Sequence, residues 1–206
     1  MAHIIINIGR QLGSGGHDIG RMLAMDFDAQ YYDRELLNLA AKESGFAEEF
    51  FEQNDEQKGF LKSLFHPRAP HVSDINFYQS NFSQESLFKF QSDAIRKAAS
   101  QGSCVFVGRC ADYVLRDVPH VANIFITADI DFRIRQVMAK EQCDARQARH
   151  KIETGEARRA NYYNYYTGKR WGDAKSYDLC ICSSKLGLQK TEHVIAAYIR
   201  QRFGLN

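Results

Sequence analysis

The chain has 206 residues, of which 44% are hydrophobic and 25% are charged, and its formal net charge is +2. This balance excludes a disordered chain, and the charge is too small to indicate nucleic acid as a partner. The sequence contains no apolar run near the roughly 18 residues that a membrane-spanning helix needs, so no membrane partner is expected. The five cysteines lack the spacing of a zinc or redox motif, which favours free thiols and a cytoplasmic location.

The first half of the chain begins with a strand and a helix joined by glycines. A β-branched apolar run predicts a buried strand at 4–8, and apolar residues at helical spacing predict a helix over 18–27. A short strand at 29–32 ends at Asp33, and a further helix is expected over 34–42. The following segment, 46–80, has seven aromatic residues, two prolines and no clear period, which predicts a mobile insertion.

The second half of the chain continues this alternation. Its expected elements, in order, are a helix over 83–100, strands at 104–107 and 121–127, a helix over 131–141, a long arginine-rich helix over 145–166, a strand at 179–182 and a closing helix over 191–203. Strands that alternate with helices indicate a parallel sheet covered on both faces. The predicted fold is therefore a single α/β domain over 1–206, with three α/β/α layers and a parallel sheet of about five strands.

The turn between the first strand and the first helix has four glycines in the eight residues 9–16. The start of a helix offers unpaired N–H groups and a partial positive charge, and glycine lets the backbone approach an anion closely. We therefore expect nucleotide phosphates to bind here, and the candidate residues are Gly13, Ser14, Gly15, Gly16, His17 and Asp18. The alternatives are a merely tight turn and, for His17, a solvent-exposed place in the first helical turn.

This turn does not match the Walker pattern of phosphate-binding loops. When the glycines are aligned, Gly16 stands where the lysine belongs, and no hydroxyl residue follows to hold magnesium. The positive charge that phosphoryl transfer requires must then come from elsewhere, and Arg10, Arg21 and Arg109 are candidates. Without such a charge, the protein would be a regulatory module that binds nucleotide without catalysis.

A different enzyme class also matches parts of the pattern. Gly9, Gly13 and Gly15 have the glycine spacing of short-chain dehydrogenases, and Asp33 stands where a ribose-binding acid would follow the second strand. Tyr165 even precedes Lys169 at the spacing of their catalytic pair, although a glycine at 168 interrupts the helix between them. An NAD(P)-dependent oxidoreductase is therefore an alternative.

Longer strings of residues distinguish these classes. In chain order they are Gly13-Ser14-Gly15-Gly16, Tyr32-Asp33-Arg34-Glu35, Val107-Gly108-Arg109-Cys110-Ala111-Asp112-Tyr113, Phe125-Ile126-Thr127-Ala128, Arg159–Gly172 and Tyr177-Asp178-Leu179. Together they resemble the cytidylate kinase-like family of bacterial proteins, which has the P-loop nucleoside-monophosphate kinase fold. The resemblance runs from about residue 4 to about residue 200, and its most specific part is the tyrosine-rich string at 162–172.

The resemblance implies ATP-dependent phosphoryl transfer, with Mg²⁺, to a nucleoside monophosphate or a related small phosphate acceptor. It implies a core with a phosphate loop, a mobile insertion at about 46–80 and a lid at about 145–172. As catalytic residues it implies Asp33 beside the metal or the acceptor, and Arg109 and Arg159 on phosphates. Arg158 in the same lid helix is a further candidate for binding ATP. No histidine or cysteine spacing typical of a metal site occurs in the sequence.

Overall fold

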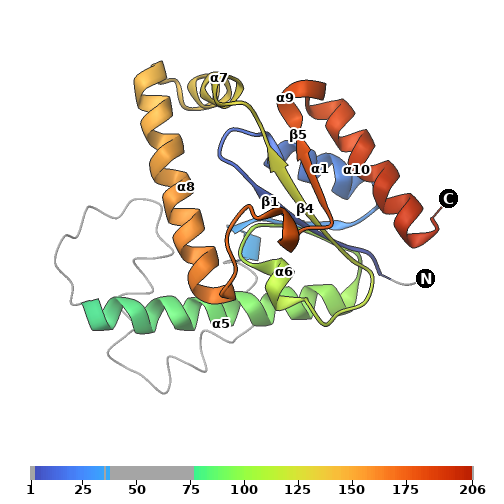
Figure 1. Cartoon of the computed structure of the whole chain (residues 1–206). Coiled ribbons are helices and arrows are strands. Elements are labelled where there is room, and N and C mark those ends of the chain that lie inside the picture. Colours follow the sequence, from blue (N-terminus) through green and yellow to red (C-terminus); the bar gives the residue numbers. More distant parts are fainter. Residues whose placement is uncertain (1–2, 35, 38–76, 206) are drawn as a thin grey trace.

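The computed structural model describes residues 3–34, 36–37 and 77–205 of the chain, and within these ranges five strands form one parallel sheet (Figure 1). The strands are β1 (Ile5–Arg10), β2 (Gln30–Tyr32), β3 (Cys104–Val107), β4 (Val121–Thr127) and β5 (Leu179–Cys182). Their order across the sheet is β2-β3-β1-β4-β5, and every neighbouring pair is parallel. The predicted five-stranded parallel sheet is confirmed.

The strand register brings the carboxyl ends of the central strands together. Ile8 of β1 pairs with Val107 of β3 on one side and with Ile124 of β4 on the other. The residues that follow β1 and β3 therefore leave the sheet side by side. In open parallel sheets, ligands bind at this carboxyl edge.

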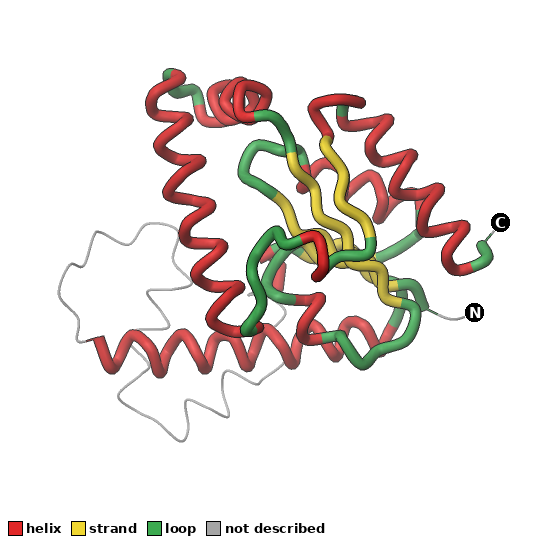
Figure 2. The backbone as a smooth tube through the Cα atoms, in the orientation of Figure 1, coloured by secondary structure: helices red, strands yellow, loops and turns green. Residues whose placement is uncertain are grey.

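Two helical layers cover the sheet, and alternate residues of β1 face opposite layers because a strand has a period of two. Ile6 and Ile8 belong to a buried cluster with α1 (Gly16–Asp26) and α10 (Leu188–Phe203). Ile5 belongs to a second cluster with α5 (Phe77–Gln101) and α6 (Ala111–Val114). Figure 2 shows the sheet between these two groups of helices. The three-layer prediction is confirmed.

Two helices extend from the carboxyl edge of the sheet. α7 (Ile130–Glu141) and α8 (Ala145–Thr167) share a small apolar cluster that contains Ile134 and Ile152. α8 begins with a capping box between Asp144 and Gln147 and ends at a left-handed Gly168. From α7, α8 runs alongside the sheet edge towards α5 (Figure 1).

Several boundaries differ from the sequence-based expectations. α5 begins at Phe77 and not at 83, because residues 77–82 are compatible with a helix although they show no apolar period. α10 begins at Leu188, and the short elements α6, η2 (Ala174–Ser176) and α9 (Ser183–Leu186) were missed. Most of the predicted insertion at 46–80 and most of the helix predicted at 34–42 lie outside the described residues, although residues 34, 36 and 37 are helical.

Two further sequence-based points concern the cysteines and the membrane. All five cysteines are free, as expected. Among the described residues, none of the helices has the length and apolar character required to cross a membrane.

Candidate active site

A cleft of about 790 Å³ opens at the carboxyl edge of the sheet. Its walls come from segments far apart in the sequence: the ends of β1, β2 and β3, the start of α1, the inner side of α8 and the chain that follows α8. The predicted catalytic residues Asp33, Arg109 and Arg159 lie in its walls, together with two predicted binding residues, His17 and Arg158. The fold thus brings the three predicted catalytic residues to one cavity.

The glycine turn beside this cleft depends on close packing against other elements. Gly13 and Gly15 have left-handed backbone angles, with φ of +81° and +77°. A Cβ atom on Gly13 would lie 2.7 Å from the carbonyl oxygen of Arg133 in α7, and one on Gly15 would overlap the side chain of Leu188 in α10. Conformation therefore favours glycine at both positions, and at Gly13 the backbone of Arg133 also leaves no space for a side chain.

Ser14, at the centre of the turn, is fully buried. Its hydroxyl donates to the carbonyl oxygen of Gln11 at 2.9 Å, and its own carbonyl accepts from the hydroxyl of Ser183 at 2.7 Å. The side chain of Ser14 thus holds the turn in shape. Gly13, Ser14, Gly15, Gly16 and Asp18 are not among the residues that line the cleft, and Asp18 is exposed to solvent.

Arg10, the last residue of β1, places its guanidinium in the cleft. Its Nε atom is buried and has no hydrogen-bond partner within the described part of the chain. Burial and the neighbouring charges of Arg159 and Arg109 lower the pKa of Arg10 to about 9, although Tyr31 and Asp33 act in the opposite direction. Because an arginine stays protonated in proteins, this lowered pKa signals a buried positive charge that lacks full compensation.

Arg109 follows β3 in an unusual stretch of backbone. Gly108, Arg109 and Cys110 all have left-handed angles, with φ of +80°, +61° and +58°. The Arg109 guanidinium donates to Gln91 Oε1 from Nε at 2.8 Å and from Nη2 at 2.6 Å, and it lies over the ring of Tyr162, 4.0 Å from the centroid. Burial lowers the pKa of Arg109. These contacts fix the direction of the guanidinium without adding a negative charge.

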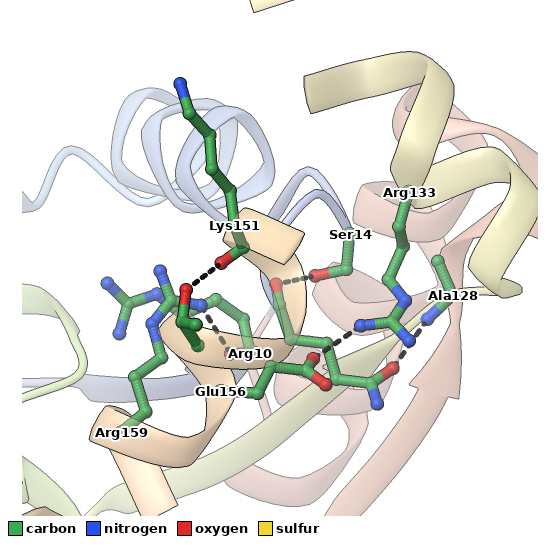
Figure 3. A network of polar contacts seen from close by, with 9 residues as sticks. Arg10, Ser14, Ala128, Arg133, Lys151, Glu156 and Arg159 are labelled. Atoms are coloured by element: carbon green, nitrogen blue, oxygen red, sulfur yellow. Dashed lines mark hydrogen bonds and ion pairs between the residues drawn. The ribbon is translucent and has the colours of Figure 1, made fainter. Parts of the chain in front are cut away.

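Arg159 of α8 reaches the same region from the opposite wall (Figure 3). Its Nη1 donates to the backbone oxygen of Arg10 at 3.2 Å, and burial lowers its pKa while Glu156 partly offsets that effect. Arg158, by contrast, is exposed at the cleft wall, and its Nε donates to the carbonyl oxygen of Thr154 within its own helix.

Two buried contacts fasten α8 to the rest of the protein. Arg133 of α7 and Glu156 form an ion pair with 2.5 Å between Nη1 and Oε1, as Figure 3 shows. Tyr163 donates its hydroxyl to Asp112 Oδ2 at 2.6 Å. Burial raises the pKa of Asp112, and the Tyr163 hydrogen bond acts against that rise. These two contacts are made by Glu156 and Tyr163, which lie on either side of Arg159 in the sequence, so they fix the part of α8 that carries Arg159.

Asp33 lies just after β2 and is buried. Its Oδ1 accepts from the backbone N–H of Leu36 at 3.0 Å, so it caps the helical turn that begins there. Its Oδ2 lies 3.8 Å from His17 Nδ1, and that nitrogen is 2.8 Å from the hydroxyl of Tyr31. Burial, followed by the charge of Arg10, lowers the pKa of His17 to about 4, so His17 is neutral at pH 7.

The cleft has an excess of positive charge. Six basic side chains line it, namely Arg10, Arg34, Arg109, Lys151, Arg158 and Arg159, against the three acids Asp33, Asp112 and Glu141. All three acids have partners, because Lys151 forms an ion pair with Glu141, Tyr163 hydrogen-bonds Asp112, and Asp33 accepts the backbone N–H of Leu36. A cavity with partly buried guanidinium groups and too few carboxylates is suited to a multiply charged anion such as a phosphate chain.

Aromatic residues join α8 to its neighbours. Tyr166 stacks on Phe88 of α5 with 4.0 Å between the ring centroids, and Trp171 packs edge-on against Phe125 of β4. These contacts agree with packing as the main role of the tyrosine-rich string.

Sequence reasoning missed two features of the site. The first is Gln91, which could have been noticed only as a polar residue on the apolar side of a predicted helix. The second is the pairing of Asp112 with Tyr163.

The comparison that decides the family is a match of residues 5–185 to the model of the cytidylate kinase-like family. The chain belongs to this family. Two cytidylate kinases are similar in sequence: that of Methanopyrus kandleri is 24% identical over 204 residues, which cover 95% of this chain and 93% of that enzyme. That of Staphylothermus marinus is 24% identical over 103 residues, and the match spans 50% of this chain and 58% of the enzyme's length.

Solved structures give the same fold for this member of the cytidylate kinase-like family. An uncharacterised protein from Eubacterium ventriosum has a TM-score of 0.73 at 29% identity, with 95% of this chain and 98% of that chain covered. Shikimate kinase from Bacteroides thetaiotaomicron has a TM-score of 0.53 at 11% identity over 99% and 100% of the two chains, a likeness of fold alone.

The strand order does not fit the oxidoreductase alternative. In dinucleotide-binding sheets β2 lies next to β1. Here β3 lies between them. Tyr165 and Lys169 do not form a catalytic pair either: Tyr165 is exposed and bonds Glu85, and Gly168 ends the helix before Lys169. The family and the fold instead support phosphoryl transfer to a nucleotide or a related acceptor.

Proposed function

We propose that this protein transfers a phosphoryl group from ATP to a nucleoside monophosphate such as cytidylate. The observation that carries the proposal is the convergence of three partly buried guanidinium groups, those of Arg10, Arg109 and Arg159, on one cleft beside a glycine turn. A transferring phosphoryl group spreads negative charge over its oxygens, and fixed positive groups around it lower the barrier. Membership of the cytidylate kinase-like family supports a nucleotide as the acceptor.

The geometry suggests a division of roles within the cleft. The turn at Gly13–Gly16 and the first turn of α1 would hold the donor phosphates, because helix N-terminal N–H groups favour anions. Arg109 would contact the acceptor phosphate, and Arg159 would reach the transferring group from α8. Neutral His17 can donate one ring N–H to a phosphate oxygen at neutral pH. Arg158 would bind at the exposed rim, nearer to solvent.

Magnesium fits this arrangement through Asp33. Mg²⁺ in kinase sites is usually held by one or two carboxylates together with substrate phosphates and water, and not by a complete protein cage. Asp33 supplies a carboxylate in the cleft wall, and the described residues contain no group of three or more metal-ligating side chains. When bound, the ion would neutralise charge on the phosphates, while Asp33 would orient it directly or through water.

The test is an ATP-consumption assay with Mg²⁺ and a panel of CMP, dCMP, UMP and AMP. We expect turnover with at least one acceptor, and a loss of about 10²- to 10³-fold in kcat/KM for Arg109→Met and Arg159→Met. Arg135→Met, which removes an exposed arginine of α7 outside the cleft, is the matched control. No ATP consumption above background with any acceptor would refute the nucleotide-kinase proposal.

A second candidate function rests on Gly16. A protein without the Walker lysine can retain ATP binding through backbone N–H groups and lose turnover. A regulatory nucleotide-binding module would show calorimetric ATP binding together with no turnover on the whole acceptor panel. Turnover of any acceptor at a rate that depends on Arg109 would exclude this second candidate.

A further inference from the structure

The side chain of Arg10 passes through the space that a Walker lysine would need. A Cβ atom on Gly16 would lie 2.6 Å from Arg10 Cβ and 2.7 Å from Arg10 Cγ. These atoms belong to the stem of Arg10 near its backbone, so they cannot move aside as the end of a flexible side chain can. Gly16 has an ordinary backbone conformation, without positive φ. It is therefore the position of Arg10, and not the local backbone, that requires glycine in the lysine slot.

The far end of the same side chain reaches a second glycine, Gly108, whose left-handed backbone already favours glycine. A Cβ atom on Gly108 would overlap Arg10 Nη1. Arg10 thus extends from the glycine turn at Gly16 to the residue just before Arg109. It links the segment expected to hold donor phosphates with the segment expected to meet the acceptor phosphate.

The charge of Arg10 is also left without a full partner inside the protein. Its Nε is buried with no hydrogen-bond partner among the described residues, and among the ion pairs between described residues none involves Arg10. Two of its nearest charged neighbours, Arg109 and Arg159, repel it. Tyr31 and Asp33 offset this repulsion only in part, so an anion that joins the Arg10 guanidinium would stabilise it further.

We propose that Arg10 is the phosphate-binding cation that replaces the Walker lysine, and that Gly16 is glycine because Arg10 occupies the space of the lysine side chain. This inference rests on the proposed kinase function for its catalytic meaning, but its binding part does not. In the transfer, the bond between the γ-phosphorus and the β–γ bridging oxygen breaks, and an acceptor phosphate oxygen forms the new P–O bond. The electron pair leaves with ADP. Arg10 stays protonated and spans both phosphate groups.

The first test measures anion binding without any nucleoside. Calorimetry with inorganic tripolyphosphate should give a dissociation constant about 10- to 100-fold weaker for Arg10→Met than for the native chain, since hydrogen bonds to charged groups are worth that much. Methionine keeps most of the stem and removes the charge. Arg149→Met, an exposed arginine of α8 outside the cleft, should bind as the native chain does. Equal tripolyphosphate binding by a folded Arg10→Met variant would overturn the inference.

The second test exchanges the two residues. Gly16→Lys alone should lose stability and binding because the lysine collides with the Arg10 stem. The double variant Arg10→Gly with Gly16→Lys removes that collision and restores the Walker arrangement, so it should recover tripolyphosphate binding to within about tenfold of the native value. If the double variant folds, by circular dichroism and thermal melting, and binds no better than Arg10→Gly alone, the replacement idea fails.

These outcomes separate the inference from the proposed function. Native protein that binds tripolyphosphate through Arg10 but phosphorylates no acceptor would contradict the kinase proposal and leave the role of Arg10 in phosphate binding supported. Active protein whose turnover and tripolyphosphate affinity do not change in Arg10→Met would support the kinase proposal and refute the inference.

Discussion

Arg159 donates a hydrogen bond to the backbone oxygen of Arg10 across 3.2 Å and so ties the long helix α8 to the end of the first strand. The two guanidinium groups lie in the same cleft and repel each other. A contact that brings like charges together is stabilised when an anion binds between them. The pair therefore indicates a protein that gains stability from its ligand, and the contacts around it give four predictions.

The first prediction concerns the neutral partner of Arg109. Gln91→Glu places a carboxylate where Gln91 Oε1 now accepts two hydrogen bonds from Arg109. The new ion pair neutralises the arginine, so we expect CMP affinity to fall by about tenfold. Calorimetry with CMP measures the effect, and Asp93→Glu, in the exposed pair of Asp93 with Arg96 on the same helix, is the control. Unchanged CMP affinity would show that Arg109 does not contact the acceptor.

The second prediction concerns the hydrogen bond that joins α8 to α6. Tyr163→Phe leaves the buried carboxylate of Asp112 without its 2.6 Å hydroxyl donor, so the free energy of unfolding should fall by about 1–3 kcal/mol. Urea denaturation at pH 7 measures it. Tyr165→Phe is the matched control, because Tyr165 is 68% exposed and its hydroxyl bonds Glu85 at the surface. Equal losses for both variants would contradict a special role of the buried bond.

The third prediction concerns the dependence of stability on pH. The pKa of His17 is about 4 in the folded protein and about 6.5 in the unfolded chain, so between these values the unfolded state binds the extra proton. Stability should therefore decrease as pH falls from 6.5 towards 4. His17→Gln should remove this contribution, and urea denaturation at pH 7, 5.5 and 4.5 should show a smaller decrease for the variant. Parallel profiles would mean that His17 titrates normally.

The fourth prediction concerns the ion pair between α7 and α8. Arg133→Met leaves Glu156 without its partner in a largely buried place, so the free energy of unfolding should fall by about 2–4 kcal/mol. The double variant with Glu156→Gln should lose less than the sum of the two single losses. Lys151→Met breaks an exposed pair with Glu141 on the same two helices and should cost clearly less than Arg133→Met, because solvent screens exposed pairs. Additive losses in the double variant would show that the pair is not coupled.

The sheet and much of the site could be predicted because their signals are local or specific to the family. The β-branched run at 4–8 and the glycines that follow it predict a buried strand and a phosphate turn without any distant contact. The string around Arg109 and that around Arg159 matched a known family. Two of the three arginines that converge on the cleft, Arg109 and Arg159, were therefore predicted as phosphate ligands from the sequence. The structure places both in the cleft, and their role as phosphate ligands stays a prediction.

The remaining features depend on contacts between distant parts of the chain. Arg10 was one of several candidate cations, and its direction becomes clear only where its stem meets Gly16 and its tip meets Gly108. The role of Gln91 depends on the fold, because the segment after β3 brings Arg109 beside it. The carbonyl oxygen of Ser14 accepts a hydrogen bond from Ser183 of α9, which follows the last strand. The periodicity of a local segment does not indicate which distant residues it will contact.

The left-handed backbone of Gly108, Arg109 and Cys110 determines at which step, folding or ligand binding, the strain of this segment is met. A left-handed conformation disfavours a residue with a side chain by roughly 1–2 kcal/mol, and two of these three residues carry one. That cost falls on folding, before any ligand arrives. Arg109 would then need no backbone rearrangement to contact an anion. This wall of the cleft is therefore pre-organised, and most of the conformational entropy lost on binding here would be lost by the ligand.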